Sequence, residues 1–308
     1  MTIEFVDRST VELIKANASD MDVAMAAWVS NFDKENLPVE IPSKRDIKNY
    51  NEYINSDIAR YREQADEWYP EVKAYNDRIS GLINFLYRER HMSPFEHGSF
   101  TFYIDTPIFV AREFMRHRTW SYNETSGRYK ELAPRFYLIS DERPVQQQGS
   151  IGKYSFGEGT AEQYGQILAN TTISYTQAWT AYQNMLKAGV AKEVARNVLP
   201  VGTMTSFYAT ANPRNVMQFL LLRNDGPALY EIRKVAEVIE QEFAKAMPLT
   251  YAAYKKYDWR DEKVELEDLR KKVAQMEAEE TYRSNIEVSR KGGMVTPYEI
   301  KTGHRAVL

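Results

Sequence analysis

Hydrophobic positions recur with helical spacing in the second half of the chain. Over residues 161–186 apolar side chains return every three or four positions and the pattern ends before Gly189, which predicts one long amphipathic helix. The same spacing over residues 229–243 predicts another helix, and residues 190–199 predict a shorter one that stops at Pro200.

Strand and helix signals follow one another in the middle of the chain. Residues 99–105 alternate aromatic and polar side chains, a pattern typical of a strand. Thr106 followed by Pro107 predicts a helix start, with a cap and a proline at the first helical position, and the helix is expected to reach about Arg116. Residues 119–135 contain glycine and proline and are interpreted as a loop.

Weaker patterns complete the outline. Residues 10–30 predict a short strand and then a helix, and residues 203–210 predict another strand. An Asn-Pro pair opens a predicted helix over residues 212–222. Residues 31–80 are polar and aromatic and predict helical pieces, whereas the glutamines and glycines of residues 141–160 predict a mobile surface loop.

An ordinary globular composition excludes several classes of protein. The 308 residues are 43% hydrophobic and 27% charged, which provides enough apolar material for a core. The formal net charge of −3 argues against a duplex nucleic-acid binder but permits local basic sites for small phosphorylated ligands. No stretch approaches 18 apolar residues, and the N-terminal residues lack the pattern of a signal peptide. We therefore expect no membrane segment and a cytoplasmic protein.

The chain contains no cysteine, which excludes disulfides, thiolate metal sites and cysteine nucleophiles. Three of its four histidines, His91, His97 and His117, fall within a short stretch, but no two of them are four residues apart. Without a helical histidine pair, or a thiol to complete a ligand set, we expect no metal site.

Arginines gather in the same region as these histidines, at Arg112, Arg116, Arg118, Arg128 and Arg135. Guanidinium groups are planar, permanently charged and matched to phosphate oxygens. Beside a loop that contains glycine they favour a site for phosphorylated ligands. The alternative is that arginines at a helix C-terminus only complement the helix dipole.

The run from Arg116 to Tyr129 carries the most specific pattern in the chain. It begins Arg-His-Arg, places Ser126 after seven further residues and continues as Gly-Arg-Tyr. This run resembles the signature of the flavin-dependent thymidylate synthases. Three further segments resemble that family in the same order, and they are residues 91–97, 195–200 and 212–223.

The resemblance covers residues 10–30 and 81–255 and implies a fold and an assembly. The family's fold is α/β, of the α+β kind, with a curved, largely antiparallel sheet flanked by helices. The family assembles as a homotetramer whose active sites lie between subunits. For this chain the resemblance implies one domain over residues 1–255, with a helical insertion at about 31–80, and a charged helical extension over 256–308.

The resemblance also implies an activity. The family uses FAD, takes electrons from NADPH and a one-carbon unit from methylenetetrahydrofolate, and converts dUMP to dTMP. Because this chain has no cysteine that could add to the uracil ring, C5 has to be activated electrostatically. An arginine against the N3/O4 edge stabilises the ring anion, and by match to the family Arg223 has that catalytic role.

Further site residues are assigned by the same match. The expected dUMP contacts besides Arg223 are Glu113, Arg116, Glu124, Thr125, Ser126, Gly127, Arg128 and Arg196. The expected FAD contacts are Ser30, Ser93, Arg116, His117, Arg118, Glu124, Asn212, Arg214 and Gln218. His91 is expected near the folate or the flavin ring, or alternatively is a structural histidine. Ser126 is expected to position substrate, because no histidine–acid pair is evident to activate it as a nucleophile.

Three positions depart from the family pattern. Glu113 stands where glutamine is frequent, and a carboxylate near the dUMP phosphate is repulsive unless it turns away. Gln218 stands where asparagine is frequent, and Asp225-Gly226-Pro227 replaces a stretch that commonly carries a histidine facing the flavin.

Three other functions fit parts of the pattern. A flavin- or nucleotide-binding module that has lost catalysis would keep the motif, but the presence of Arg223 argues against it. A nucleic-acid-associated protein would use the arginines on phosphates, but the acidic charge balance argues against it. A related flavoenzyme would methylate uracil in RNA, but the motif matches the enzymes that act on the free nucleotide.

Overall fold

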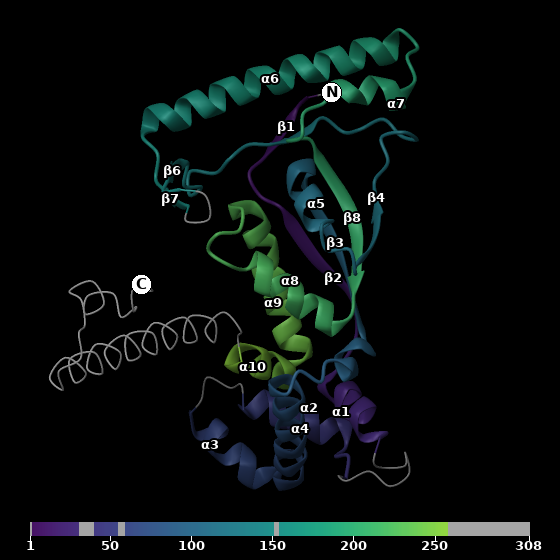
Figure 1. The fold of residues 1–308 in the computed structure, drawn as a ribbon, viewed down its shortest axis with the longest axis vertical. Helices are drawn as coiled ribbons and strands as arrows, with labels where there is room; N and C mark the ends of the chain where they lie inside the picture. The colour runs from purple at the N-terminus through teal and green to yellow at the C-terminus, as the bar shows by residue number, and fades with distance from the viewer. Residues whose placement is uncertain (1, 31–39, 55–58, 151–153, 258–308) are drawn as a thin grey trace, which may run out of the picture. The chain divides into compact units, whose positions relative to one another are not determined.

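The computed structural model describes residues 2–30, 40–54, 59–150 and 154–257 (Figure 1). The chain divides into two compact units, residues 1–254 and 255–308. Almost all of the second unit, and all but residues 256 and 257 of the charged extension expected over residues 256–308, lies outside the described residues. The elements below belong to the first unit, apart from the end of the last helix.

Four strands form the main sheet, in the order β2 (Thr10–Asn17), β3 (Ser99–Pro107), β8 (Met204–Ala211) and β4 (Ser121–Glu124) (Figure 1). All three pairings are antiparallel, which confirms the expected type of sheet. The pairing of β2 with β3 shifts register between Leu13 and Lys15, an irregularity of the kind that bends a strand locally.

Alternation along the two central strands gives the sheet one buried face. Phe100, Phe102 and Ile104 of β3 are fully buried. Because successive strand residues point to opposite faces, Tyr103 and its cross-strand partner Tyr208 project from the other side. There the two tyrosine rings meet edge to face, with centroids 5.3 Å apart.

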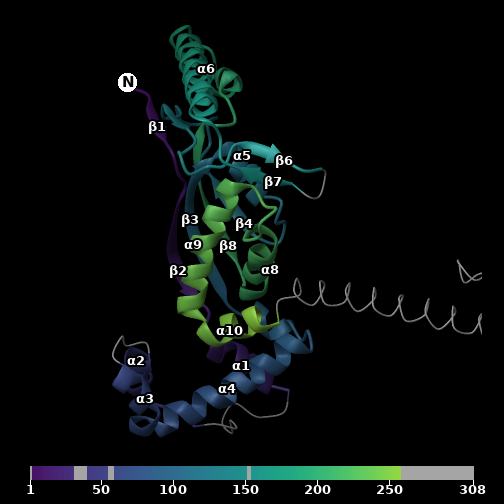
Figure 2. The same ribbon diagram turned by 90° about the vertical axis from the view of Figure 1, so that its left-hand side faces the viewer.

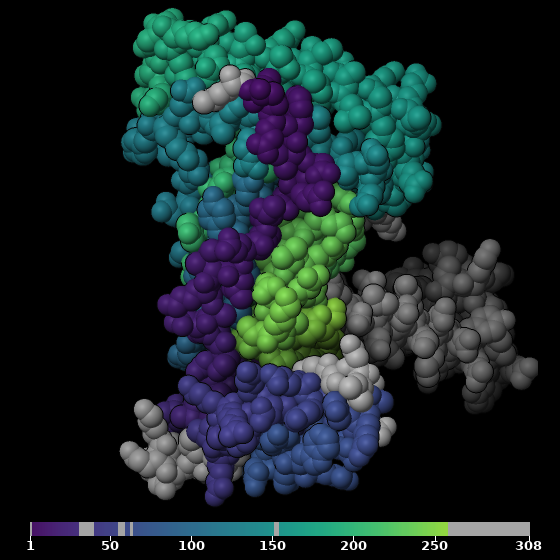
Figure 3. Space-filling view, turned by 180° about the vertical axis from the view of Figure 1, so that it is seen from behind, coloured from purple at the N-terminus to yellow at the C-terminus, as the bar shows by residue number. Residues whose placement is uncertain are grey.

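The buried face of the sheet is covered by α5 (Ile108–Phe114), α8 (Pro213–Arg223) and α9 (Tyr230–Ala246). Figure 2 shows α8 and α9 along one side of the sheet, and Figure 3 shows the N-terminal strands beside α9. Phe243 of α9 packs against Phe100 with ring centroids 5.5 Å apart. Phe114 of α5 packs against Phe207 at 5.5 Å and against Phe219 of α8 at 4.5 Å. Burial of each such ring stabilises the fold by about 1.5–3 kcal/mol, so this core fixes α5 against α8.

The first part of the chain adds helices α1 (Asp20–Trp28), α2 (Lys44–Ile54), α3 (Ala59–Trp68) and α4 (Pro70–Arg88). The predicted helical pieces are therefore present in the described part of residues 31–80. Asp20 joins α1 to α10 (Pro248–Lys256), since its carboxylate accepts hydrogen bonds from Leu249 N at 2.9 Å, Thr250 N at 2.8 Å and Thr250 Oγ1 at 2.6 Å. Burial nevertheless raises the pKa of Asp20.

The long helix predicted from periodicity is α6 (Ala161–Lys187), which begins at a capping box on Thr160. Trp179 and Tyr182 are its buried residues, and they pack in one cluster with Phe136. Phe136 lies on β5 (Arg135–Tyr137), which pairs in parallel with β1 (Glu4–Val6). Within the described residues, no helix is both long enough and apolar enough to cross a lipid bilayer.

The structure corrects the predicted start and end of α5. Thr106 remains in β3, Pro107 is the N-cap, and the helix ends at Phe114 with Met115 as its C-cap. Thr106 is fully buried and its hydroxyl lies 2.7 Å from that of Ser9, so the strand continues where local signals predicted a cap. As a result Arg116 follows the helix and is not part of it.

Two predicted loops contain strands, and one predicted helix is shorter. Residues 119–135 include β4, whose polar sequence lacks the apolar alternation that marks a strand but which pairs with the edge of β8. Residues 141–160 include β6 (Gln146–Gln148) and β7 (Ser155–Gly157), which pair with each other. The helix predicted over residues 190–199 is a four-residue α7 (Lys192–Ala195) followed by a 3₁₀ turn, η2 (Arg196–Val198).

Candidate active site

Arg223, at the C-terminal end of α8, is held by residues from the end of α5. Its Nε donates to Nε2 of His117 at 3.0 Å, its Nη1 to Oε2 of Glu113 at 3.1 Å, and its Nη2 to the Glu113 carbonyl at 3.4 Å. The aromatic contact between Phe114 and Phe219 sets the two helices together, and the ring of Phe219 also lies 4.9 Å from that of His117. The packed core thus brings together residues that are more than 100 positions apart in the chain.

His117 is neutral in this arrangement. Its Nε2 accepts the hydrogen bond from Arg223, so in the neutral ring the proton lies on Nδ1. Burial and then the positive charge of Arg223 lower the pKa of His117 to about 4. The histidine therefore acts as a hydrogen-bond acceptor for the guanidinium at physiological pH, not as a second cation beside it.

A pocket of about 460 Å³ opens beside this group and is lined by Phe109, Arg112, Glu113, Arg116, Val201 and Arg223. It contains three guanidinium groups and one carboxylate. Neither Arg112 nor Arg116 forms an ion pair with any residue that the structure describes. The excess of positive charge suits an anionic ligand such as a phosphate ester.

The motif loop, residues 124–130, forms a second group at the end of β4. Glu124 Oε1 accepts a hydrogen bond from Thr205 Oγ1 at 2.6 Å, and Thr125 N donates to the Ser206 carbonyl at 2.9 Å. These two contacts fix the start of the loop on β8. The Ser126 hydroxyl then accepts from the backbone N–H of residue 128 at 3.3 Å, which closes a turn.

Gly127 allows the motif loop to approach Arg196. A Cβ atom at residue 127 would lie 3.2 Å from Cδ of Arg196 and 3.1 Å from Cδ1 of Leu132, closer than ordinary van der Waals contact. Arg128 is exposed, and its Nε forms an ion pair with Oε2 of Glu193 at 3.0 Å. The loop thus carries Ser126 and Arg128, and its Gly127 lies against Arg196 of η2.

The predicted FAD contacts of α8 form a third group, at its N-terminus. Asn212 caps the helix, since its Oδ1 accepts from Asn215 N at 2.9 Å. Arg214 and Gln218, four residues apart, are exposed on the same face of the helix. Arg214 forms an ion pair with Glu96 of η1 (Ser93–Glu96), the short segment that also carries Ser93.

Three other predicted site residues make no contact, within the described part of the chain, that joins them to the groups around Arg223, the motif loop or the start of α8. Ser30 is exposed and its hydroxyl donates to the Ala27 carbonyl at 2.9 Å. His91 is exposed and its ring meets that of Phe85 edge to face at 5.8 Å. Arg118 is exposed. The roles assigned to all the site residues remain predictions.

The structure identifies residues that the sequence analysis did not assign. Arg112, which the sequence marks only as a member of the arginine cluster with no assigned ligand contact, lines the pocket. Glu193 pairs with Arg128, and Thr205 holds Glu124. Neither stands in a motif, so only the folded chain shows these two contacts.

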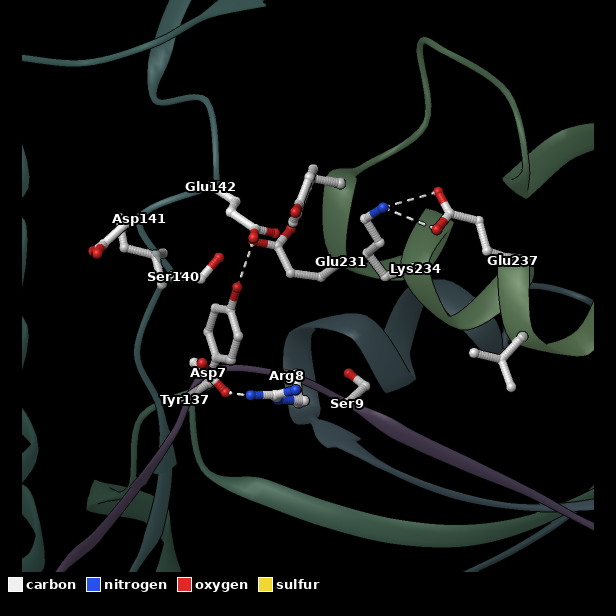
Figure 4. A pocket seen from close by; sticks show the side chains of 13 residues that line it. Asp7, Arg8, Ser9, Tyr137, Ser140, Asp141, Glu142, Glu231, Lys234 and Glu237 are labelled. Atoms are coloured by element: carbon white, nitrogen blue, oxygen red, sulfur yellow. Dashed lines mark hydrogen bonds and ion pairs between the residues drawn. The ribbon is translucent and has the colours of Figure 1, made fainter.

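A larger pocket, of about 650 Å³, contains none of the predicted site residues (Figure 4). Figure 4 shows the Tyr137 hydroxyl directed at the buried carboxylate of Glu231, a hydrogen bond of 3.0 Å. The lining of this larger pocket carries two cations, Arg8 and Lys234, and five carboxylates, those of Asp7, Asp141, Glu142, Glu231 and Glu237. This acidic surplus disfavours a phosphate, so the smaller pocket is the better candidate. Among the described residues, no three histidine or carboxylate side chains converge as metal ligands would.

Known proteins resemble the chain over most of its length. The family model described as thymidylate synthase complementing protein matches residues 12–249. A flavin-dependent thymidylate synthase of Streptomyces avermitilis is 46% identical over 256 residues, which is 80% of this chain and 90% of the relative. The enzyme of the same name from Tropheryma whipplei is 40% identical over 259 residues, covering 82% and 94%.

Solved structures agree with the sequence comparisons. The UMP/dUMP methylase PolB from Streptomyces cacaoi, bound with 5-Br dUMP, superposes with a TM-score of 0.68 at 36% identity, covering 83% of this chain and 98% of PolB. The same protein bound with 5-Br UMP gives a TM-score of 0.67. The match of the family model, the identity to the relatives and the shared fold place this chain in the flavin-dependent thymidylate synthase family.

Proposed function

We propose that the chain converts dUMP to dTMP by reductive methylation, with methylenetetrahydrofolate as carbon donor and NADPH as reductant through bound FAD. The observation that carries the proposal is the pocket in which the guanidinium group of Arg223 lies with those of Arg112 and Arg116. Family membership supports the reaction, and the absence of cysteine requires that C5 of the uracil be activated without a thiolate.

Arg223 has the donors that this activation needs. An arginine carries five N–H groups, and three of them are used on His117 and Glu113. The two that remain, one on each Nη, would be available to the O4/N3 edge of the pyrimidine. Negative charge that develops on this edge during methylation is stabilised by fixed donors without reorganisation. The positive charge of Arg112 and Arg116 attracts the nucleotide to the pocket.

The residues at the start of α8 fit a dinucleotide. Pro213 has no N–H and Asn212 caps residue 215, which leaves the backbone N–H of Arg214 without a helical partner at the positive end of the helix dipole. Asn212, Arg214 and Gln218 would hold FAD along the helix, with Ser93 at one end and His117 at the other. When bound, the flavin supplies the hydride that completes the methyl group.

The motif loop fits a site shared between subunits. Among the described residues no hydrogen bond or ion pair joins residues 124–130 to Arg223. In a homotetramer, the motif loop of a neighbouring subunit would supply Ser126 and Arg128, together with Arg196 of that subunit's η2, to the dUMP phosphate in the pocket of the first. This arrangement explains why the predicted dUMP contacts fall into two groups in one chain.

The test is to purify the protein, record its visible spectrum and incubate it without oxygen with dUMP, NADPH and methylenetetrahydrofolate. Formation of dTMP that depends on all three, and flavin bands that bleach faster when dUMP is present, are expected. A protein that takes up FAD and binds dUMP but forms no dTMP would reduce the proposal to a binding function.

UMP is a second candidate substrate. The matching structures are described as a UMP/dUMP methylase and were solved with both 5-bromo nucleotides. The same assay with UMP in place of dUMP distinguishes the two, and we expect dUMP to have the larger kcat/KM because the sequence relatives are thymidylate synthases.

A further inference from the structure

We infer that Glu113 is a positioning residue that orients Arg223 for the pyrimidine edge, and is not itself a contact for dUMP. The inference rests on the proposed function. It departs from the expectation drawn from the family pattern, in which the residue at position 113 touches the substrate.

Glu113 binds Arg223 twice, through its side chain and through its backbone. Oε2 accepts from Nη1 at 3.1 Å, and the carbonyl oxygen accepts from Nη2 at 3.4 Å. The same carbonyl also accepts from Arg116 N at 3.2 Å, which ties it to the turn that ends α5. Together with His117 on Nε, these contacts occupy all three nitrogens of the guanidinium and fix its plane.

The acceptors on Glu113 and His117 determine which N–H groups of Arg223 remain available to a ligand. Two acceptors on Glu113 and one on His117 leave a single N–H on each Nη, and Arg223 lines the pocket with Arg112 and Arg116. A guanidinium with a free side chain would lose rotamer entropy on binding the pyrimidine, at a cost that a fixed one avoids. The carboxylate of Glu113 therefore acts through Arg223.

The negative charge of Glu113 has a separate effect from its hydrogen bond. The Glu113 side chain is 42% exposed at the pocket, where it reduces the attraction of the site for a nucleotide phosphate. A glutamine keeps an oxygen acceptor for Nη1 and removes the charge, whereas an alanine removes both. Glutamine is therefore expected to keep or raise dUMP affinity, whereas alanine, which also loses the hydrogen bond to Nη1, is expected to lower it.

The experiment measures dUMP affinity by calorimetry and steady-state kcat and KM on the FAD-loaded protein. Glu113→Gln is expected to keep kcat within about threefold and to bind dUMP as tightly as wild type or several-fold more tightly. Glu113→Ala is expected to lose roughly 10-fold in dUMP affinity, the size of one hydrogen bond to a charged group, and to lower kcat as well. Glu237→Ala removes a carboxylate that also forms an ion pair, with Lys234 at 2.9 Å, and is the matched control with unchanged values.

A double-mutant cycle with Arg223→Ala shows whether Glu113 acts through Arg223. Glu113→Ala should cost no further dUMP affinity in the Arg223→Ala background. An equal loss in both backgrounds would show a direct contact with substrate and overturn the inference, as would a Glu113→Gln variant as weak as Glu113→Ala. Failure of the proposed function looks different, because wild type would then bind dUMP and show the same cycle but form no dTMP.

Discussion

Replacing Arg223 with alanine removes the group on which the proposed chemistry depends. In the folded chain the guanidinium makes three hydrogen bonds and offers two further N–H groups to the pocket. Loss of one preorganised donor to a developing anion costs about 2.7–4 kcal/mol, or roughly 10²–10³ in kcat. With two donors lost, we expect a decrease in kcat at the upper end of that range.

The same substitution should change stability little. The Arg223–Glu113 ion pair is partly exposed, with side-chain exposures of 22% and 42%, and such pairs contribute about 0–1 kcal/mol. FAD is expected to remain bound, because Arg223 is not among its predicted contacts and those on α8, at Asn212, Arg214 and Gln218, lie nearer the start of the helix. The variant should therefore be yellow and folded, yet almost inactive.

The pKa of His117 provides an independent measurement of the effect of Arg223→Ala. The charge of Arg223 is the second cause, after burial, of the low pKa of His117. In Arg223→Ala the pKa of His117 should rise from about 4 toward the ordinary histidine value, as measured by NMR titration of its ring protons. Steady-state assays of purified wild type and variant, at saturating dUMP and folate, give the decrease in kcat. A variant whose kcat stays within fivefold of wild type would refute the assigned role of Arg223.

The remaining predictions concern binding, pH and stability. Ser126→Ala should raise the KM for dUMP several-fold and keep some turnover, and complete loss of turnover with normal dUMP binding would instead support Ser126 as a nucleophile. Because the pKa of His117 is lower in the folded than in the unfolded chain, the unfolded state binds the extra proton between about pH 6.5 and 4. Stability should therefore fall as pH decreases through that window, and His117→Asn should reduce this fall when urea unfolding is compared at pH 7 and pH 5. Asp20→Ala leaves Leu249 N and both donors of Thr250 without their acceptor, so it should lower the free energy of unfolding by about 2–4 kcal/mol. A loss below 1 kcal/mol in urea titration would show that α1 and α10 are held together by other contacts.

Local pattern predicted those elements whose signals come from neighbouring residues. The period of α6 and the alternation of β3 are visible in the sequence because each places one face of a regular element against the core. The start of α8 is visible in the sequence too, because the Asn212 cap and the proline at the first helical position act on neighbouring backbone groups. By contrast, β4 was interpreted as loop, because its polar residues become a strand only by pairing with β8.

The start of α5 shows how tertiary context overrides a local signal. Thr106 and Pro107 have the form of a cap followed by a first helical residue, yet Thr106 is buried in β3, where its hydroxyl meets that of Ser9. The partner lies 97 positions away in the chain, which no local window includes.

For the candidate site, the sequence by itself determined the kinds of groups present. They are arginines, histidine and a loop that contains glycine, and there is no thiol. Only the tertiary structure decided which of them meet. It places Arg223 on Glu113 and His117, respectively 110 and 106 positions apart, and pairs Arg128 with Glu193. The physical reason is the separation along the chain over which each kind of information acts. Side-chain chemistry and helical or strand period are properties of a residue and its neighbours, whereas these contacts depend on how Phe114, Phe219 and the sheet pack together.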